Sequence, residues 1–109
     1  MNITININEN DFTVSAVLEG EIDAYTAPEV RKELLPKTNA PGVKMIIDLS
    51  GVSYMDSTGL GVFVGLFKEL KANEGKLILT GMSDRLKRLF DITGLADVMD
   101  INTEVEGGV

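Results

Sequence analysis

The sequence predicts a single α/β domain with a mixed β-sheet, on three observations. Two stretches near the start alternate apolar and polar residues, as half-buried strands do. Farther along the chain, short apolar runs alternate with stretches of helical period, which is typical of an α/β fold. The length of 109 residues, 44% of them hydrophobic, is that of one domain with one core. We therefore assign residues 1–109 to one domain, with residues 103–109 as a frayed tail.

The first two strands are expected to form an antiparallel hairpin. Isoleucine alternates with asparagine and threonine over residues 2–8, and residues 12–18 alternate again, with Phe12 and Leu18 on the apolar face. A polar turn at residues 9–11 joins the two stretches. Because a hairpin pairs its strands antiparallel, the sheet is predicted to be mixed rather than all parallel.

The first helix is expected to begin at Thr26, after a loop that opens at residues 20–23. Thr26 is placed to cap the free backbone amides, Pro28 lies in the tolerant first turn, and Glu29 completes a capping box. Pro36 is expected to end this helix.

The rest of the chain repeats the order of strand and helix. The last helix is expected to be capped by Ser83 at its start and by Gly94 at its end. The expected elements are a central strand at 43–49, a connection at 50–56, the longest helix at about 57–73, a strand at 77–79, the last helix after Ser83 and a short strand at 98–101.

The composition excludes several kinds of chemistry. The chain has no cysteine and no histidine, which excludes disulfides, thiolate nucleophiles, zinc fingers and imidazole bases, and we expect no cofactor and no metal. The net charge of −7 argues against direct nucleic-acid binding and favours a partner with a basic face. No apolar run reaches the roughly 18 residues of a membrane span, and residues 1–8 do not resemble a secretory signal. We therefore expect a cytoplasmic protein.

The stretch at residues 54–61 (YMDSTGLG) is expected to join the central strand to the start of the longest helix. In open α/β sheets, this end of the strands is where ligands and partners bind. Two interpretations of Ser57 are open. It could be the N-cap of the helix, with Asp56 favouring the positive end of the helix dipole. It could instead be a phosphoacceptor, because a phosphate is tolerated at a helix N-terminus and would add negative charge beside Asp56 and Asp23.

The helix that follows is expected to turn one apolar stripe toward the core. The stripe consists of Leu60, Phe63, Val64, Phe67 and Leu70. Val62 and Leu66 fall outside it, on the same side as Gly65. Each glycine inside a helix costs about 1 kcal/mol relative to alanine. Close packing on the sheet and an accessible apolar strip for a partner both explain the glycines, and Val62 and Leu66 are candidate contacts in the second case.

Enzyme signatures are absent from the sequence. There is no phosphate-binding loop, Val64 stands where a dinucleotide fingerprint needs a small residue, and no nucleophile elbow or histidine is present. Asp48 and Asp56 are better explained as turn and cap residues than as a metal pair. We therefore expect no enzymatic activity.

A phosphotransfer receiver domain is the alternative, since it has similar size and α/β character. A receiver needs an acidic pair after its first strand and a lysine after a late strand. Here Glu9 and Asp11 lie in the expected hairpin turn, and residues 79–81 contain no lysine.

Three segments together resemble a known family. They are residues 20–23 (GEID), 54–61 (YMDSTGLG) and 88–95 (RLFDITGL). In this order and spacing they resemble the anti-sigma factor antagonists, the single-domain members of the STAS group. The resemblance is closest to the RsbV type, which acts on the general stress sigma factor sigma-B of Gram-positive bacteria. It implies a mixed sheet of four or five strands with helices packed mainly on one face.

The resemblance also implies a partner-switching cycle in transcription regulation. The unphosphorylated antagonist binds an anti-sigma factor that is also a serine kinase, and the sigma factor is freed. The kinase then phosphorylates the serine that matches Ser57, with Thr58 as a minor acceptor, and a serine phosphatase reverses the change. The free protein is expected to be a monomer.

The partner-binding residues are drawn from two loops and the helix that begins at the second loop. Asp23 matches the acidic residue that the family places beside the phosphorylated serine. The residues expected to bind the partner are Asp23, Ala24, Tyr25, Thr26, Asp56, Ser57, Thr58, Gly59, Gly61, Val62 and Leu66.

Overall fold

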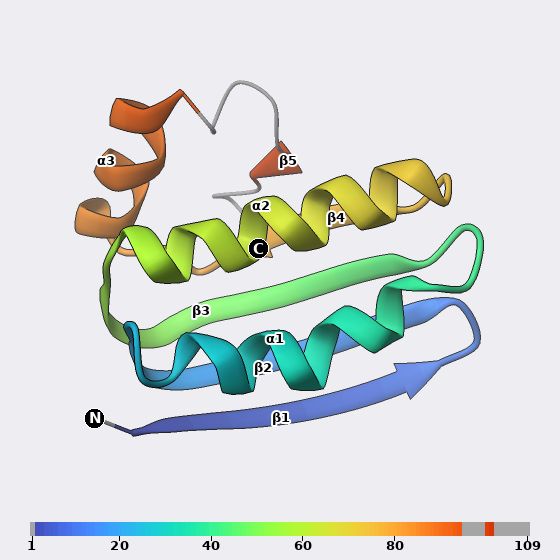
Figure 1. Ribbon diagram of the computed structural model, residues 1–109, viewed down its shortest axis with the longest axis horizontal. Helices are drawn as coiled ribbons and strands as arrows, with labels where there is room; N and C mark the ends of the chain where they lie inside the picture. Colours follow the sequence, from blue (N-terminus) through green and yellow to red (C-terminus); the bar gives the residue numbers. More distant parts are fainter. Residues whose placement is uncertain (1, 95–99, 102–109) are drawn as a thin grey trace.

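The computed structural model describes residues 2–94 and 100–101, and it places five strands in one sheet (Figure 1). The strand order is β1-β2-β3-β4-β5. β1 and β2 pair antiparallel, and the other neighbouring strands pair parallel, so the sheet is mixed as predicted. The strands are β1 (Ile3–Asn10), β2 (Thr13–Ile22), β3 (Lys44–Met55), β4 (Lys76–Thr80) and β5 (Asp100–Ile101).

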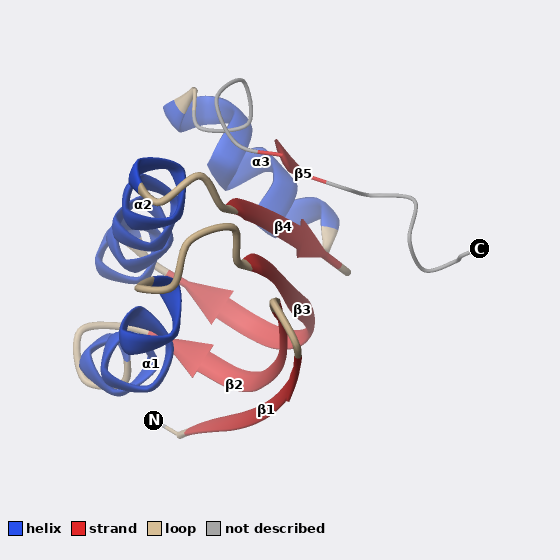
Figure 2. Cartoon of the chain, turned by 90° about the vertical axis from the view of Figure 1, so that its right-hand side faces the viewer, coloured by secondary structure: helices blue, strands red, loops and turns tan. Residues whose placement is uncertain are grey.

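The helices are α1 (Ala27–Leu34), followed by a 3-10 turn η1 (Leu35–Thr38), then α2 (Ser57–Ala72) and α3 (Asp84–Thr93). Figure 2 shows α1 and α2 on one face of the curved sheet, with α3 toward the β4 side. Among the described residues, no helix covers the opposite face. This confirms the expected packing of helices mainly on one face.

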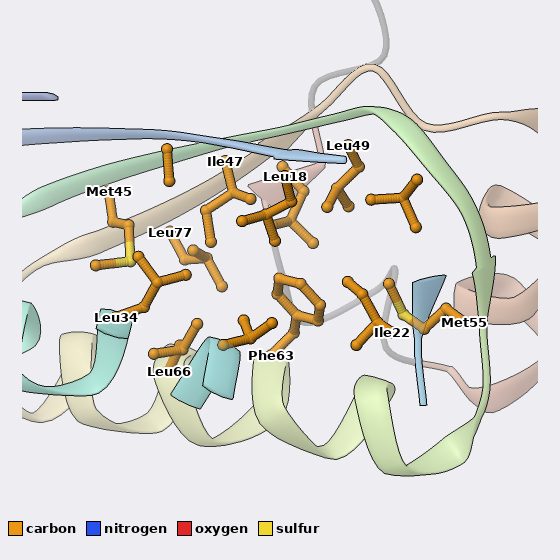
Figure 3. Close-up of a cluster of buried hydrophobic side chains, with 14 of the residues drawn as sticks. Leu18, Ile22, Leu34, Met45, Ile47, Leu49, Met55, Phe63, Leu66 and Leu77 are labelled. Carbon is orange, nitrogen blue, oxygen red and sulfur yellow. The ribbon is translucent and has the colours of Figure 1, made fainter. Parts of the chain in front are cut away.

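The core lies between the sheet and the helices α1 and α2. Alternate residues of β2 and β3, among them Leu18 and Ile47, are fully buried and face Phe63 of α2 (Figure 3). Phe63 also makes an edge-to-face contact with Phe90, with ring centroids 6.5 Å apart, which ties α3 to α2. Phe12 is 65% exposed in the hairpin turn, so its predicted place on the apolar face is wrong.

β2 and β3 both run farther than the sequence predicts. The expected connection at residues 50–56 is mostly strand, because β3 continues to Met55 beside β2, which continues to Ile22. The register shifts between Val17 and Glu19 and again between Gly20 and Glu21. Each shift places an extra residue in β3, which breaks the alternation of that strand and hid its extension. β2 keeps its alternation, with Leu18 and Ile22 buried, and its extension was missed because Gly20 and Glu21 were assigned to a loop.

The ends of α1 and α3 differ in how well they were predicted. α3 is capped as expected: Ser83 Oγ accepts a hydrogen bond from the Leu86 amide at 3.2 Å, and Gly94 adopts a left-handed φ of 79°. α1 ends at Leu34, and Pro36 lies in the 3-10 turn that continues the chain. Of the last predicted strand, residues 100–101 are β5; residues 98–99 and the predicted tail lie outside the described residues.

The buried face of α2 is turned away from the predicted stripe, toward Gly59 and Leu66. Leu60, Phe63 and Leu70 are buried as expected, but Val64 and Phe67 are only partly buried. Leu66 is 0% exposed, so its predicted place on an accessible strip is wrong. The physical reason is that α1 and η1 pack alongside α2, and Leu34 and Leu66 join the same core cluster (Figure 3).

Candidate functional site

The site lies at the carboxyl ends of β2 and β3, where residues 23–26 form a loop and Asp56 alone joins β3 to α2. Ile22 and Met55 are register partners at the ends of these parallel strands, and the Asp56 amide donates a hydrogen bond to the Ile22 carbonyl oxygen at 3.2 Å. The first residues after the two strands, Asp23 and Asp56, therefore emerge side by side at one edge of the sheet. Both segments that the sequence singled out thus lie together.

Asp56 caps the start of α2, and Ser57 does not. Asp56 has extended backbone angles (φ −111°, ψ −171°), and its Oδ1 accepts hydrogen bonds from the amides of Thr58 at 2.9 Å and Gly59 at 3.2 Å. Ser57 is the first helical residue, and it is exposed. The interpretation of Ser57 as the N-cap is therefore wrong, and its hydroxyl is left available for chemistry.

The first turn of α2 packs closely on the two strand ends. A Cβ on Gly59 would lie 2.6 Å from Ile22 Cγ2 and 2.9 Å from Met55 Cγ, which is too close for any side chain. Gly59 is itself buried, so its role is packing rather than the predicted partner contact. A Cβ on Gly61 or Gly65 would meet no atom within 4 Å. Close packing therefore explains Gly59 only, and the protein itself gives no reason for Gly61 and Gly65.

The loop after β2 is a tight turn closed by two buried polar side chains, Asp23 and Thr26. Asp23 Oδ1 accepts hydrogen bonds from the amides of Tyr25 at 2.9 Å and Thr26 at 3.0 Å. Thr26 Oγ1 donates to the Glu21 carbonyl oxygen at 2.7 Å and accepts from the Asp23 amide at 2.9 Å. The predicted capping box is wrong, because the Thr26 hydroxyl faces back into the turn and makes no cap to α1.

The Asp23 carboxylate is ionised at neutral pH. Its burial opposes ionisation, but the hydrogen bonds from the Thr26 and Tyr25 amides and from the Thr26 hydroxyl outweigh it and hold the pKa of Asp23 below its usual value of 3.8. The site therefore contains two acidic residues, with Asp23 directly after the end of β2 and Asp56 directly after the end of β3.

Several other side chains of the site point outward. Ala24 and Thr58 are exposed, and Tyr25 is 86% exposed. Val62 is partly buried and packs against the core, which leaves only part of it accessible. Tyr54 is 43% exposed near the end of β3; it begins the stretch 54–61 but was not among the residues expected to bind the partner.

The two acidic residues weighed for the receiver alternative, Glu9 and Asp11, do not lie at this site. The predicted place of Glu9 in the hairpin turn is wrong, because Glu9 belongs to β1, where it pairs with Val14 of β2 and forms an ion pair with Lys37 at 2.6 Å. Asp11 lies in the hairpin turn as predicted, at the other end of β2 from Asp23. Within the described ranges, no cluster of three or more acidic side chains is placed to hold a metal ion. In the same part of the chain, no helix has both the length and the apolar character needed to cross a membrane.

The fold and this site define the class of protein to which the chain belongs. Residues 3–107 match the family model described as STAS domain, and the chain belongs to this family. Within it, the chain belongs with the anti-sigma-B factor antagonists. It is 50% identical over 109 residues to the anti-sigma-B factor antagonist of Bacillus subtilis, covering 100% of this chain and 99% of the relative. It is 54% identical to that of Listeria monocytogenes, covering 98% of this chain and 94% of the relative.

Solved structures agree with this assignment. The anti-sigma factor antagonist SpoIIAA in its unphosphorylated form superposes with a TM-score of 0.78 at 28% identity, covering 94% of this chain and 91% of that one. SpoIIAA of Bacillus in the phosphorylated form superposes with a TM-score of 0.71 at 27% identity, covering 94% and 95%. The expected STAS-like fold is thereby confirmed.

Proposed function

We propose that this protein is an anti-anti-sigma factor that works by partner switching in the sigma-B stress response. Its unphosphorylated form binds an anti-sigma factor that is also a serine kinase, and the sigma factor is released to join RNA polymerase. Phosphorylation of Ser57 by that kinase dissociates the complex, and a serine phosphatase restores the active form. The names of the relatives, anti-sigma-B factor antagonists, support the antagonist role.

The observation that carries the proposal is that Asp56 caps α2 while the neighbouring Ser57 does not. Asp56 holds the amides at the start of α2, and the exposed Ser57 hydroxyl is not needed for the cap. A kinase can therefore modify Ser57 without first breaking a structural hydrogen bond of the cap. Thr58 is also exposed one residue later, and we retain it as a minor acceptor.

The switch acts through charge. A phosphate adds about −1.5 to −2 at neutral pH, beside the carboxylate of Asp56 and close to the turn of Asp23. The amides of Thr58 and Gly59, which would otherwise attract the phosphate, already bind Asp56. The added charge is therefore poorly neutralised within the domain, and a partner surface pressed against it would have to desolvate it.

The partner surface consists of the exposed residues around Ser57. We assign to it Ala24 and Tyr25 in the loop after β2, the half-buried Asp56 at the start of α2, and Thr58, Gly61 and the accessible part of Val62 on α2. We add Tyr54 on the same edge. Asp23 and Thr26 act from inside the turn that carries Tyr25. We further propose that the protein acts in the cytoplasm as a monomer when free, binds no cofactor and catalyses no reaction itself.

The test measures binding to the purified anti-sigma kinase by titration calorimetry. Ser57→Ala is expected to bind within about threefold of wild type, because it removes a hydroxyl and adds no charge. The phosphorylated protein is expected to bind at least about 100-fold more weakly, which corresponds to about 3 kcal/mol. Asn8→Asp, which adds a charge on exposed β1 near the other end of the sheet, is the control and is expected to bind like wild type. Equal binding by the phosphorylated and unphosphorylated forms would overturn the switch.

A further inference from the structure

The turn after β2 exposes one aromatic side chain and buries the residues that flank it. Tyr25 is 86% exposed, whereas Asp23 is 6% and Thr26 is 4% exposed. Single exposed apolar residues are common on protein surfaces and need no explanation by themselves. What distinguishes Tyr25 is that its backbone amide is held by Asp23 Oδ1 at 2.9 Å, inside a turn closed again by Thr26. The turn thus fixes the point from which the tyrosine projects.

This turn is continuous with the proposed binding surface. Ile22, the last residue of β2, pairs with Met55 of β3 and accepts a hydrogen bond from the Asp56 amide. The start of α2 packs on the same two residues through Gly59. A partner that covers Ser57 therefore also lies next to the end of β2, which leads directly into the Tyr25 turn.

Resting on the proposed function, we infer that Tyr25 is the anchor of partner recognition and that Thr26 is its positioning residue. The partner that fits is a protein surface with an apolar pocket for the ring and a hydrogen-bond acceptor for the phenol hydroxyl. Tyrosine is enriched among the few residues that carry most of the binding energy at interfaces, because one rigid side chain offers apolar area and a polar tip. A turn that is already ordered loses little conformational entropy on binding.

The anchor and the switch are separable in this arrangement. Ser57 decides whether the complex forms, because phosphorylation adds charge there. Tyr25 lies in the loop after β2 and takes no part in phosphoryl transfer. When the kinase phosphorylates Ser57, Tyr25 therefore contributes the same binding energy in the bound substrate and in the transition state. Loss of such uniform binding raises KM and leaves kcat unchanged.

Thr26 acts through Tyr25 rather than by touching the partner. Its hydroxyl joins the Glu21 carbonyl oxygen to the Asp23 amide across the turn. Thr26→Val keeps the shape of the side chain and removes these two hydrogen bonds together with the one to Asp23 Oδ1 at 3.3 Å, so the turn loosens and the tyrosine loses its fixed position. Thr26→Ser keeps the hydroxyl and is expected to restore partner binding.

The experiment measures affinity for the purified anti-sigma kinase together with KM and kcat for phosphorylation of Ser57. Tyr25→Ala is expected to weaken binding and to raise KM by about tenfold or more, with kcat within about twofold of wild type. The control is Phe12→Ala, which removes an aromatic ring that is 65% exposed in the hairpin turn at the other end of β2. It is expected to leave both quantities unchanged.

The role of Thr26 is tested by changing it both in the wild-type protein and in the Tyr25→Ala variant. Thr26→Val is expected to weaken binding in the wild-type protein and to have no further effect in Tyr25→Ala, whereas Thr26→Ser binds like wild type. Thermal unfolding of each variant verifies that it is folded, and Tyr25→Ala, at an exposed position, is informative even where Thr26→Val is not folded. Wild-type binding by Tyr25→Ala overturns the anchor. Additive losses in the double variant overturn the positioning role of Thr26. Failure of the unaltered protein to bind the kinase overturns the proposed function itself.

Discussion

The first turns of α2 have one side that packs on the strand ends and one side that faces solvent, and neighbouring residues belong to different sides. On the side that faces the strand ends, Asp56 caps the helix and Gly59 makes room for Ile22 and Met55. On the side that faces solvent, Ser57 does not cap the helix and Gly61 does not pack closely against any neighbour. Residues that build the fold and residues of the proposed partner surface therefore alternate at spacings of one to a few positions. Stability and binding should respond to different members of each pair, and the following variants test this.

The largest difference is expected between Leu66 and Val62. Leu66→Glu places an unpaired carboxylate in the core and is expected to cost several kcal/mol, a large part of the roughly 5–15 kcal/mol that stabilises a domain. Val62→Glu changes a side chain that is only partly buried, and we expect a loss of about 1 kcal/mol in stability. Urea unfolding followed by circular dichroism compares the two.

The same pair tests the binding surface. Folded Val62→Glu is expected to bind the anti-sigma partner at least about tenfold more weakly, a loss of about 1.4 kcal/mol. Should Val62→Glu unfold as readily as Leu66→Glu, or bind the partner normally, Val62 belongs to the core side of the helix.

Gly59 and Gly61 are expected to respond to alanine with opposite signs. Gly59→Ala drives a methyl group against Ile22 and Met55 and is expected to destabilise the fold by about 1–3 kcal/mol. Gly61→Ala has open space and is expected to stabilise the helix by about 0.5–1 kcal/mol. Thermal unfolding of the free proteins gives both values. Gly61→Ala should nevertheless bind the partner more weakly, and unchanged binding would show that no partner approaches this position closely.

Variants of Asp56 and Ser57 separate the helix cap from the proposed phosphorylation site. Asp56→Ala is expected to cost about 1 kcal/mol of stability because it leaves two amides of α2 without their acceptor. Ser57→Ala is expected to change stability by less than about 0.5 kcal/mol, as exposed substitutions usually do. Chemical unfolding measures both. A larger loss for Ser57→Ala than for Asp56→Ala would mean that the cap is assigned to the wrong residue.

The smallest expected effect is the pH dependence that Asp23 contributes. Its pKa in the folded protein lies below the value of 3.8, so ionised Asp23 stabilises the folded state above that pH. This contribution is lost as the pH falls from about 4 toward the folded-state pKa. Asp23→Asn should therefore flatten the pH dependence of stability in acid and leave the difference from wild type constant near neutral pH. A wild-type pH profile in the Asn variant would remove Asp23 as its source.

The sequence predicted the elements better than it predicted their ends. Period-two alternation located β1 and most of β2, and Ser83 and Gly94 located the ends of α3, because these signals depend on residues within a few positions of one another. The extension of β3 was missed because two register shifts each add a residue to this strand and break its alternation, and the extension of β2 was missed because Gly20 and Glu21 are typical of a loop.

For the candidate site, the sequence by itself determined which segments matter. The stretch 54–61, with a serine between an acidic residue and a glycine-rich helix start, is local in the chain and indicates a site by itself, whereas residues 20–23 were singled out by the family resemblance. Only the tertiary structure decided which residue does what. Asp56 caps because the strand end delivers it in an extended conformation, Thr26 closes a turn because Glu21 and Asp23 fold back around it, and Leu66 is buried because α1 packs beside α2. Each of these depends on contacts between segments far apart in the chain or on backbone angles, and the order of residues alone does not specify them.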